Sequence, residues 1–539
     1  MDKSPDIDIV SPPPAPLSAS PGDGGLDTGS SQPRKWIGLL ALAAGLGVAE
    51  IVTGFDRFLR SPVIAVGDWI IDHTPGWLER FAIRTFGTND KLVLKWGIFA
   101  VLIVLSLRLA GVMARRRNLA RGLVVVVSIV GATLAFAGRA GRLIDVLPAL
   151  VGGAVTLVVL EKLVPRRVTS PASPESGGAA TSAVAAASGV ERRQFIMLAS
   201  GAGVVAVGGF GVGRALRTRY SAALDRAKAI LPKSKTLPAA PEGVDFNLPG
   251  LSPIFTPNKN FYLIDASQGA PNVTRATWAL RVRGMVDKEI NLNFDQLLAR
   301  PQFEVDVTIS CVSNEVGGDL VGTARWQGIR LDDLLHEAGI KPEADQIVGR
   351  SIDGWTGGFP TAVLDGRDAM IAIGMNGEPL PVSHGYPARL IVPGVYGYVS
   401  ATKWLSEIEL TRFDKFQGFW IPRGWNVDGV IETESRIDVP GSSIAAGPTK
   451  IAGVAWAGIR TISKVEVQIN KDPWREGTLS KELAKTTWRQ WVLDWDAPKG
   501  KHDITVRATD GDGKVQTDKQ TSPGPGAASG YHTIRVTVG

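Results

Sequence analysis

Cysteine and histidine are scarce in this sequence. There is one cysteine, Cys311, and there are five histidines among 539 residues. A single cysteine excludes an intramolecular disulfide, a cysteine-rich zinc site and an iron–sulfur cluster held by cysteines alone. His73 is the only histidine before residue 336, so the N-terminal half lacks the paired histidines that would hold a haem between helices. We therefore expect neither a haem nor an iron–sulfur cluster in this chain.

A strong excess of either charge is also lacking. The net charge is +7, which is modest for 539 residues, and part of it comes from arginines that flank apolar runs. A nucleic-acid partner is therefore not expected. Long apolar runs fill the chain up to about residue 215, whereas the remainder has the mixed composition of globular domains. This division indicates several domains of different kinds.

Five apolar segments predict a transmembrane region over residues 36–213. Residues 1–35 precede it and are rich in Pro, Gly and Ser, so they are predicted to form a disordered tail. The apolar segments are 36–55, 92–112, 123–137, 143–163 and 195–212. A spanning helix needs about 20 apolar residues, but the third segment is short and the fifth contains many glycines. About five helices are predicted, and retention of the fifth as a membrane span stays open. A charged linker, residues 214–249, follows.

Basic residues indicate how these helices are oriented. Lys and Arg concentrate in the cytoplasmic loops of membrane proteins. With a cytoplasmic N-terminus, the basic residues that lie inside are Arg34, Lys35, Arg115, Arg116, Arg117, Arg166, Arg167, Arg192 and Arg193. Five spans in lipid then place everything after Val212 on the extracytoplasmic side of the cell membrane.

The sequence ERRQFI at 191–196 resembles the twin-arginine export motif, in which two arginines precede a Phe and an aliphatic residue. The alternative is ordinary positive flanking of a membrane span, where pairs of arginines are common. The export reading gains weight if the following domain carries a cofactor, because this route moves folded proteins.

Short β-rich runs and a few helical patterns alternate between residues 250 and 440. Residues 277–285 and 305–309 alternate as strands do, and 389–393 reads as a buried strand that ends in a turn. One face of a predicted helix carries Leu331, Leu334, Leu335 and Ala338. These patterns predict an α+β domain with a mixed sheet.

Several motifs in this region resemble those of sulfite oxidases and plant nitrate reductases. Around the cysteine the chain reads ISCVSN at 309–314 and ARWQG at 324–328. Further on it reads NGEPLP at 376–381, HGYPAR at 384–389, VPG at 392–394 and KW at 403–404, and TPN at 256–258 with FY at 261–262 resembles the opening segment. Because the motifs occur in the family's order, the region is identified as a member of the sulfite oxidase family.

The resemblance implies a molybdopterin cofactor. The pterin dithiolene supplies two sulfurs to molybdenum, and a soft protein thiolate completes the set, which makes Cys311 the metal ligand. Arg389 and Lys403 are implied as cationic donors to the pterin's phosphate. The cofactor-binding positions are Asn260, Tyr262, Cys311, Asp353, His384, Arg389, Gly397, Tyr398 and Lys403. Taken singly, His384 reads equally as a surface residue of a turn and Arg389 as a cation at a strand end.

The chain departs from the family where a substrate would bind. An arginine of the family is replaced at Ile264, and an Asn-Arg-Arg sequence is replaced by Asn314-Glu315-Val316. The family's active-site tyrosine aligns with Trp355. We take Trp355 and Arg325 as catalytic candidates beside Cys311, with Arg325 or Arg423 as the residue that restores a positive charge. Arg325 reads equally as a cation at the edge of the core, and sulfite is not a secure substrate.

Residues 441–539 resemble the immunoglobulin-like domain that follows the molybdenum domain in this family, which implies an all-β sandwich and a possible homodimer. The predicted enzyme is a membrane-tethered molybdenum oxidoreductase that transfers an oxygen atom, with two electrons, to or from a small sulfur compound. A separate redox protein, such as a cytochrome or a membrane electron carrier, is the expected electron partner. The alternatives are a reductase of sulfoxides and a non-catalytic membrane scaffold that retains the fold.

Overall fold

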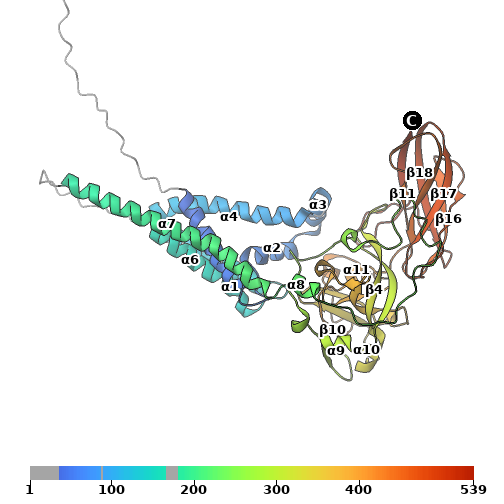
Figure 1. The fold of residues 1–539 in the computed structure, drawn as a ribbon, viewed down its shortest axis with the longest axis horizontal. Coiled ribbons are helices and arrows are strands. Elements are labelled where there is room, and N and C mark those ends of the chain that lie inside the picture. Colours follow the sequence, from blue (N-terminus) through green and yellow to red (C-terminus); the bar gives the residue numbers. More distant parts are fainter. Residues whose placement is uncertain (1–34, 87–88, 165–179) are drawn as a thin grey trace, which may run out of the picture.

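The computed structural model describes residues 35–86, 89–164 and 180–539. It has an N-terminal helical region, a central region of strands and short helices, and a C-terminal β region, which follow one another along the length of the molecule (Figure 1). The disordered tail predicted for residues 1–35 lies, apart from Lys35, outside the described residues. The three-part architecture predicted from the sequence is confirmed.

Five helices are long and apolar enough to cross a membrane. They are α1 (Trp36–Thr53), α4 (Asp90–Arg115), α5 (Arg117–Ala137), the segment of η2 (Leu143–Val146) with α6 (Leu147–Leu163), and α7 (Ala180–Thr218). The third segment is longer than its apolar run because α5 begins at Arg117 and reaches 21 residues. Two shorter helices, α2 (Pro62–His73) and α3 (Gly76–Phe86), lie between α1 and α4.

Small residues let α1 pack closely against α6 and α7. A Cβ atom at Gly45 would stand 2.5 Å from the carbonyl oxygen of Gly152, and one at Gly209 would stand 2.6 Å from that of Gly47. Both distances are shorter than a van der Waals contact, so these positions exclude any side chain. Close backbone approach at glycines is typical of helices that associate within membranes.

Two sheets form the central region. One has the order β3-β4-β7-β8, with β9 beside β7, and comprises β3 (Phe303–Ser310), β4 (Val321–Arg330), β7 (Met370–Met375), β8 (Glu378–Pro379) and β9 (Arg389–Ile391). The other has the order β2-β1-β10-β5-β6 and comprises β1 (Ala279–Gly284), β2 (Ile290–Asn293), β5 (Gln346–Ser351), β6 (Thr356–Pro360) and β10 (Leu405–Thr411). Because β1 and β10 are parallel and the other pairs antiparallel, the second sheet is mixed, as predicted.

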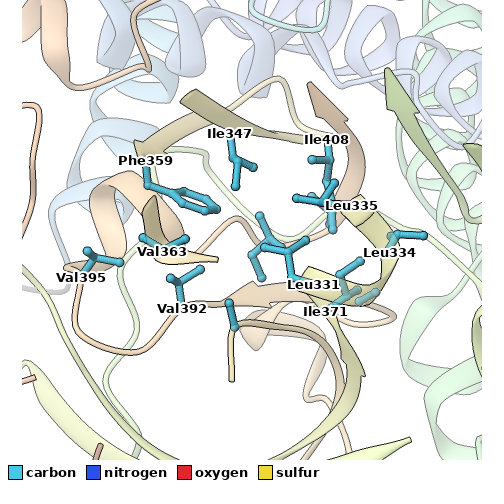
Figure 2. Packing of buried hydrophobic residues seen from close by; sticks show 14 of the residues in the cluster. Leu331, Leu334, Leu335, Ile347, Phe359, Val363, Ile371, Val392, Val395 and Ile408 are labelled. Atoms are coloured by element: carbon cyan, nitrogen blue, oxygen red, sulfur yellow. The ribbon is translucent and has the colours of Figure 1, made fainter. Parts of the chain in front are cut away.

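The core of this region lies between the sheets, and helix α10 (Leu331–Ala338) supplies one side of it. Leu331, Leu334 and Leu335 are fully buried and pack with Ile347 of β5 and Ile371 of β7 (Figure 2). The spacing that predicted this helix therefore describes its buried face.

The C-terminal region is a sandwich of two sheets around one apolar core. Their orders are β11-β13-β17-β16 and β12-β19-β18-β14-β15. The strands are β11 (Glu434–Val439), β12 (Ser443–Ile444), β13 (Gly447–Trp456), β14 (Ile462–Ile469), β15 (Arg475–Glu476), β16 (Thr478–Leu479), β17 (Arg489–Ala497), β18 (Gly500–Asp510) and β19 (His532–Val538). Since β11 pairs with β13, this region begins by Glu434 and not at residue 441.

The segment predicted as a linker, residues 214–249, packs against the central region. It begins inside α7 and contains the short helix α8 (Ala222–Ala227). Asp225 forms an ion pair with Arg275 (3.2 Å) and accepts a hydrogen bond from the hydroxyl of Tyr386 (2.6 Å). The helical region is therefore followed directly by chain that belongs to the surface of the central region.

Candidate functional site

Cys311 follows β3 at the start of a tight turn. Its backbone N–H donates to Leu320 O (2.9 Å), and its Sγ accepts from the N–H of Ser313 (3.4 Å). The residue is 8% exposed. Burial raises the pKa of the thiol, although the Ser313 hydrogen bonds and the charge of Lys403 oppose the rise. A thiol of this kind is a poor free nucleophile, whereas coordination to a metal would deprotonate it outright.

A buried cationic cluster stands near this thiol. Arg389, on β9, is 2% exposed and donates to His384 O (3.0 Å). Lys403 Nζ donates to Asp265 Oδ1 (2.5 Å) and to Ser383 O (3.0 Å). Burial, helped by the charges of Arg389 and Lys403, lowers the pKa of His384 to about 3. Burial also lowers the pKa of Arg389 to about 10.

Gly385 makes the close approach of Arg389 and Lys403 possible. Its φ is +109°, a conformation that favours glycine. A Cβ atom there would stand 3.0 Å from Arg389 Cβ and 3.1 Å from Lys403 Cα. The glycine of the predicted HGYPAR motif therefore has a geometric role in bringing the two cations together.

The donor set fits an anionic cofactor held by one thiolate. Within the described part of the chain, Arg389 hydrogen bonds only to main-chain oxygens, and Asp265 is the carboxylate bonded to Lys403. Buried positive charge without a matching anion is costly, and a phosphate would remove that cost. No group of three or more His, Cys, Asp or Glu side chains that could hold a metal occurs among the described residues, so a molybdenum here would depend on the pterin sulfurs and Cys311.

Tyr262 and Gly397 join the same site. Burial and, after it, the charge of Cys311 raise the pKa of Tyr262. A Cβ atom at Gly397 would lie 3.9 Å from Tyr262 Oη and 3.8 Å from Ser310 O. The structure therefore brings together Cys311, Tyr262 and Gly397 and adds the cationic cluster beside them.

The other predicted cofactor residues lie around this centre and are engaged elsewhere. The hydroxyl of Tyr398 donates to Asn426 O (2.6 Å), and its ring packs on Trp425. Asp353 is buried and accepts hydrogen bonds from the backbone N–H of Trp355 (3.0 Å) and from the hydroxyl of Ser267, so it shapes the turn at 351–355. Asn260 is exposed in η3 (Asn258–Asn260). The half-buried ring of Trp355 covers Gly357.

Arg325 is not brought to Cys311. In the β3–β4 ladder, Val321 is opposite Ser310 and Arg325 is opposite Asp306, which separates Arg325 from the cysteine turn by about 13 Å along the strand at roughly 3.3 Å per residue. Its guanidinium holds both oxygens of Asp306 (2.8 and 2.9 Å) and Pro238 O (3.0 Å). The proposed catalytic role of Arg325 is corrected to a structural one, because its charge is already matched by a buried carboxylate.

Arg423, the other proposed source of positive charge, contacts the helical region. It donates to Asp72 O (2.7 Å), and its guanidinium lies 3.7 Å from the ring centre of Phe419. Asp265, which bonds Lys403, was not among the residues predicted for the site. Nothing in the sequence pointed to it as a site residue, because its partner is 138 positions away.

Glu434 is a further buried group that sequence reasoning missed. Its carboxyl accepts from the hydroxyl of Tyr396 (3.1 Å) and from Asn314 Nδ2 (3.4 Å), so it joins the turn after Cys311 to the loop before Gly397. Burial raises its pKa to about 8. A folded-state pKa above the unfolded value means that the protonated form stabilises the fold, fully below about pH 4.5 and less as pH rises through 8.

Glu434→Gln should therefore remove a pH dependence of stability. The wild type should lose at most about 3 kcal/mol between pH 5.5 and pH 8, at about 1.4 kcal/mol per pH unit, and the variant should not. The measurement is chemical unfolding followed by tryptophan fluorescence at both pH values. Glu432→Gln, which changes an exposed neighbour, is the control and should keep the slope; equal slopes in the wild type and Glu434→Gln would contradict the assignment.

Comparisons with known proteins agree with this geometry. The model of the oxidoreductase molybdopterin binding domain matches residues 267–420. The uncharacterized oxidoreductase YuiH of Bacillus subtilis (strain 168) is 36% identical over 152 residues, which cover 28% of this chain and 74% of that protein. The mitochondrial sulfite oxidase of Homo sapiens is 28% identical over 315 residues, which cover 49% of this chain and 57% of that protein. The chain thus spans little more than half of that relative.

Among solved structures, the sulfane dehydrogenase SoxCD from Paracoccus pantotrophus aligns with a TM-score of 0.48 and 24% sequence identity. The alignment covers 53% of this chain and 82% of that one.

Proposed function

Because the chain belongs to the sulfite oxidase family of molybdopterin-binding oxidoreductases, we propose that it transfers oxygen atoms to or from a small sulfur-containing substrate. The overall change is substrate plus water to oxidised substrate, two protons and two electrons, or the reverse. The electrons pass to or from a separate redox protein, such as a cytochrome or a membrane electron carrier. Membrane anchoring through the five apolar helices keeps the enzyme beside such partners.

The observation that carries this proposal is the position of the only thiol in the chain. Cys311 is buried in a turn whose surroundings include Tyr262, Gly397 and the cations Arg389 and Lys403. The bound cofactor would supply the two-electron exchange of oxygen at molybdenum. The chain would supply the thiolate of Cys311, a neutral His384, and fixed positive charge for the phosphate at Arg389 and Lys403.

The residues near the site favour a substrate with little negative charge. Ile264 is exposed where the family has an arginine, and Val316 and Trp355 replace charged or hydroxyl-bearing residues. Arg325 forms an ion pair with Asp306, and Arg423 donates to Asp72 O. Both guanidinium groups are therefore already engaged and do not offer a positive charge for binding sulfite. Reduction of a sulfoxide is therefore the second candidate direction.

The experiment is elemental analysis and turnover of the full chain in detergent. We expect one molybdenum per chain, no stoichiometric iron, and sulfite oxidation far weaker than that of a sulfite oxidase, because loss of a charged contact costs about 2–5 kcal/mol where the partner charge stays buried. Sulfoxide reduction with an artificial electron donor, assayed in parallel, separates the two directions.

Absence of molybdenum from the purified chain would exclude the proposed enzyme and leave the non-catalytic membrane scaffold as the remaining alternative. Efficient sulfite oxidation that Arg423→Ala abolishes would show instead that the charge has been relocated, and Arg325→Ala is the matched control.

We also propose that the catalytic region lies outside the cytoplasm. The cluster at Arg115–Arg117 stands at helix ends away from that region, and Arg193 begins the apolar span of α7, whereas Lys91 and Arg139 at the opposite helix ends contact the catalytic region. Basic residues favour the cytoplasmic side, which supports this orientation. Export through the motif at Arg192 and Arg193, and a homodimer through the C-terminal sandwich, are parts of the same proposal.

A further inference from the structure

Side chains of the helical region form hydrogen bonds with one loop of the catalytic region. We call residues 265–268 the docking loop, and Arg60, Asp68, Lys91 and Arg139 the clamp residues. Figure 1 shows α2, which carries Asp68, beside the catalytic region. The contacts are Lys91 Nζ to Ser267 O (3.0 Å) and to Asp265 O, Arg139 Nη2 to Ala266 O (2.8 Å), Gln268 N to Asp68 Oδ1 (3.0 Å), and Arg60 Nη2 to Asp353 O (3.2 Å).

The clamp residues are themselves fixed. Arg60 forms an ion pair with Asp68 (2.8 Å), and Arg139 forms one with Asp72 (2.9 Å), both acids belonging to α2. The side chains of Arg139 and Asp72 are 10% and 8% exposed. Charged hydrogen bonds that are largely desolvated are stronger than those at a surface, so this interface is a defined structure and not a loose contact.

Two glycines show how closely the regions fit. A Cβ atom at Gly67 of α2 would stand 1.6 Å from Gln268 Nε2. A Cβ atom at Gly354, whose φ is +88°, would stand 2.7 Å from Arg139 Cβ. At Gly354 the neighbouring atoms include the backbone of Arg139, so no side chain fits there unless the two regions separate, whereas at Gly67 the amide end of the Gln268 side chain would have to move.

The docking loop is also bonded to the cofactor-binding residues. Asp265 at its start holds Lys403 (2.5 Å), and Ser267 donates to Asp353. One residue, Asp265, thus links Lys403 to Lys91, which lies in the first turn of the membrane helix α4. Release of the docking loop would take the Asp265 carboxylate away from Lys403 and leave it the carbonyl of Ser383.

We propose that the helical region clamps the cofactor site, with Lys91 as a positioning residue that acts through the docking loop on Lys403. The membrane part then retains the cofactor in addition to anchoring the chain. The inference rests on the proposed function for the identity of the ligand, the molybdenum–pterin phosphate.

The test is the rate at which the full-length holoenzyme loses its cofactor in detergent. Molybdenum and pterin that stay with the chain are measured after timed incubation and desalting. Lys91→Met should release both about 10- to 100-fold faster, as expected for loss of charged hydrogen bonds, and Lys91→Arg should release them nearly as slowly as the wild type. Lys450→Met is the matched control, because it removes a lysine from an exposed pair with Asp494.

Arg139→Met provides a second variant in case Lys91→Met folds poorly, since it removes the hydrogen bond to Ala266 O of the docking loop. Release from Lys91→Met and Arg139→Met at the wild-type rate, with the cofactor present at the start, would overturn the clamp while leaving the proposed function intact. A wild-type chain that holds neither molybdenum nor pterin would overturn both.

Discussion

Cys311→Ser should abolish turnover while leaving the fold and the pterin largely in place. Serine has nearly the same size as cysteine, so the turn and its hydrogen bonds to Leu320 and Ser313 should persist. Its hydroxyl is a hard ligand and does not replace a soft thiolate on molybdenum. Loss of a partner that merely supports a ligand costs about 10- to 100-fold in activity, so loss of the ligand itself should cost more than about 100-fold.

The measurement combines turnover with molybdenum and pterin content and with an unfolding curve. Ser313→Ala is the control, because it keeps the backbone N–H that donates to Sγ and should cost far less. Normal turnover in Cys311→Ser would contradict the assignment of Cys311 as the molybdenum ligand. The unfolding curve would reveal a variant that does not fold. In that case turnover and cofactor content would be measured on Cys311→Ala instead.

The residues of the site that could be predicted are those within short motifs. His384, Gly385 and Arg389 are neighbours in the chain, and the turn at Gly385 brings Lys403 to them. Helix α10 was predicted from its spacing, because four apolar residues on one face must be buried. In both cases the information is local, so the sequence contains it.

The residues that could not be predicted are joined by contacts between distant segments. Lys91 and Asp265 are 174 positions apart, and in the sequence Lys91 looks like any basic residue at the end of a membrane helix. Arg325 was predicted to restore a lost positive charge, whereas the β3–β4 register sets it opposite Asp306, which already matches that charge. The start of the C-terminal sandwich at β11 depends on pairing with β13 and leaves no local signal.

The clamp also bears on how the chain is assembled. The docking loop of the catalytic region contacts Lys91, Arg139 and Asp68. The catalytic region must therefore lie on the same side of the membrane as the parts of the helical region that carry these three residues. Under the proposed orientation, a domain that encloses a cofactor acquired in the cytoplasm would have to cross the membrane as a folded unit. The first four helices would need no such route, so under this proposal two modes of insertion would meet at Arg192 and Arg193 in α7.

Replacing Arg192 and Arg193 together with lysine should therefore strand the catalytic region on the cytoplasmic face while the first four helices still insert. The double-lysine variant keeps the positive charge that orients the helices, so a change in topology would reflect recognition of the arginine pair itself. α7 carries the pair and continues to Thr218, ahead of the catalytic region.

The measurement is protease accessibility of the C-terminal half in intact spheroplasts, with Arg115→Lys and Arg116→Lys together as the matched control. We expect cleavage in the wild type and the control, and protection in the Arg192 and Arg193 variant. Equal cleavage in all three would defeat the export route, and protection in the wild type would overturn the orientation.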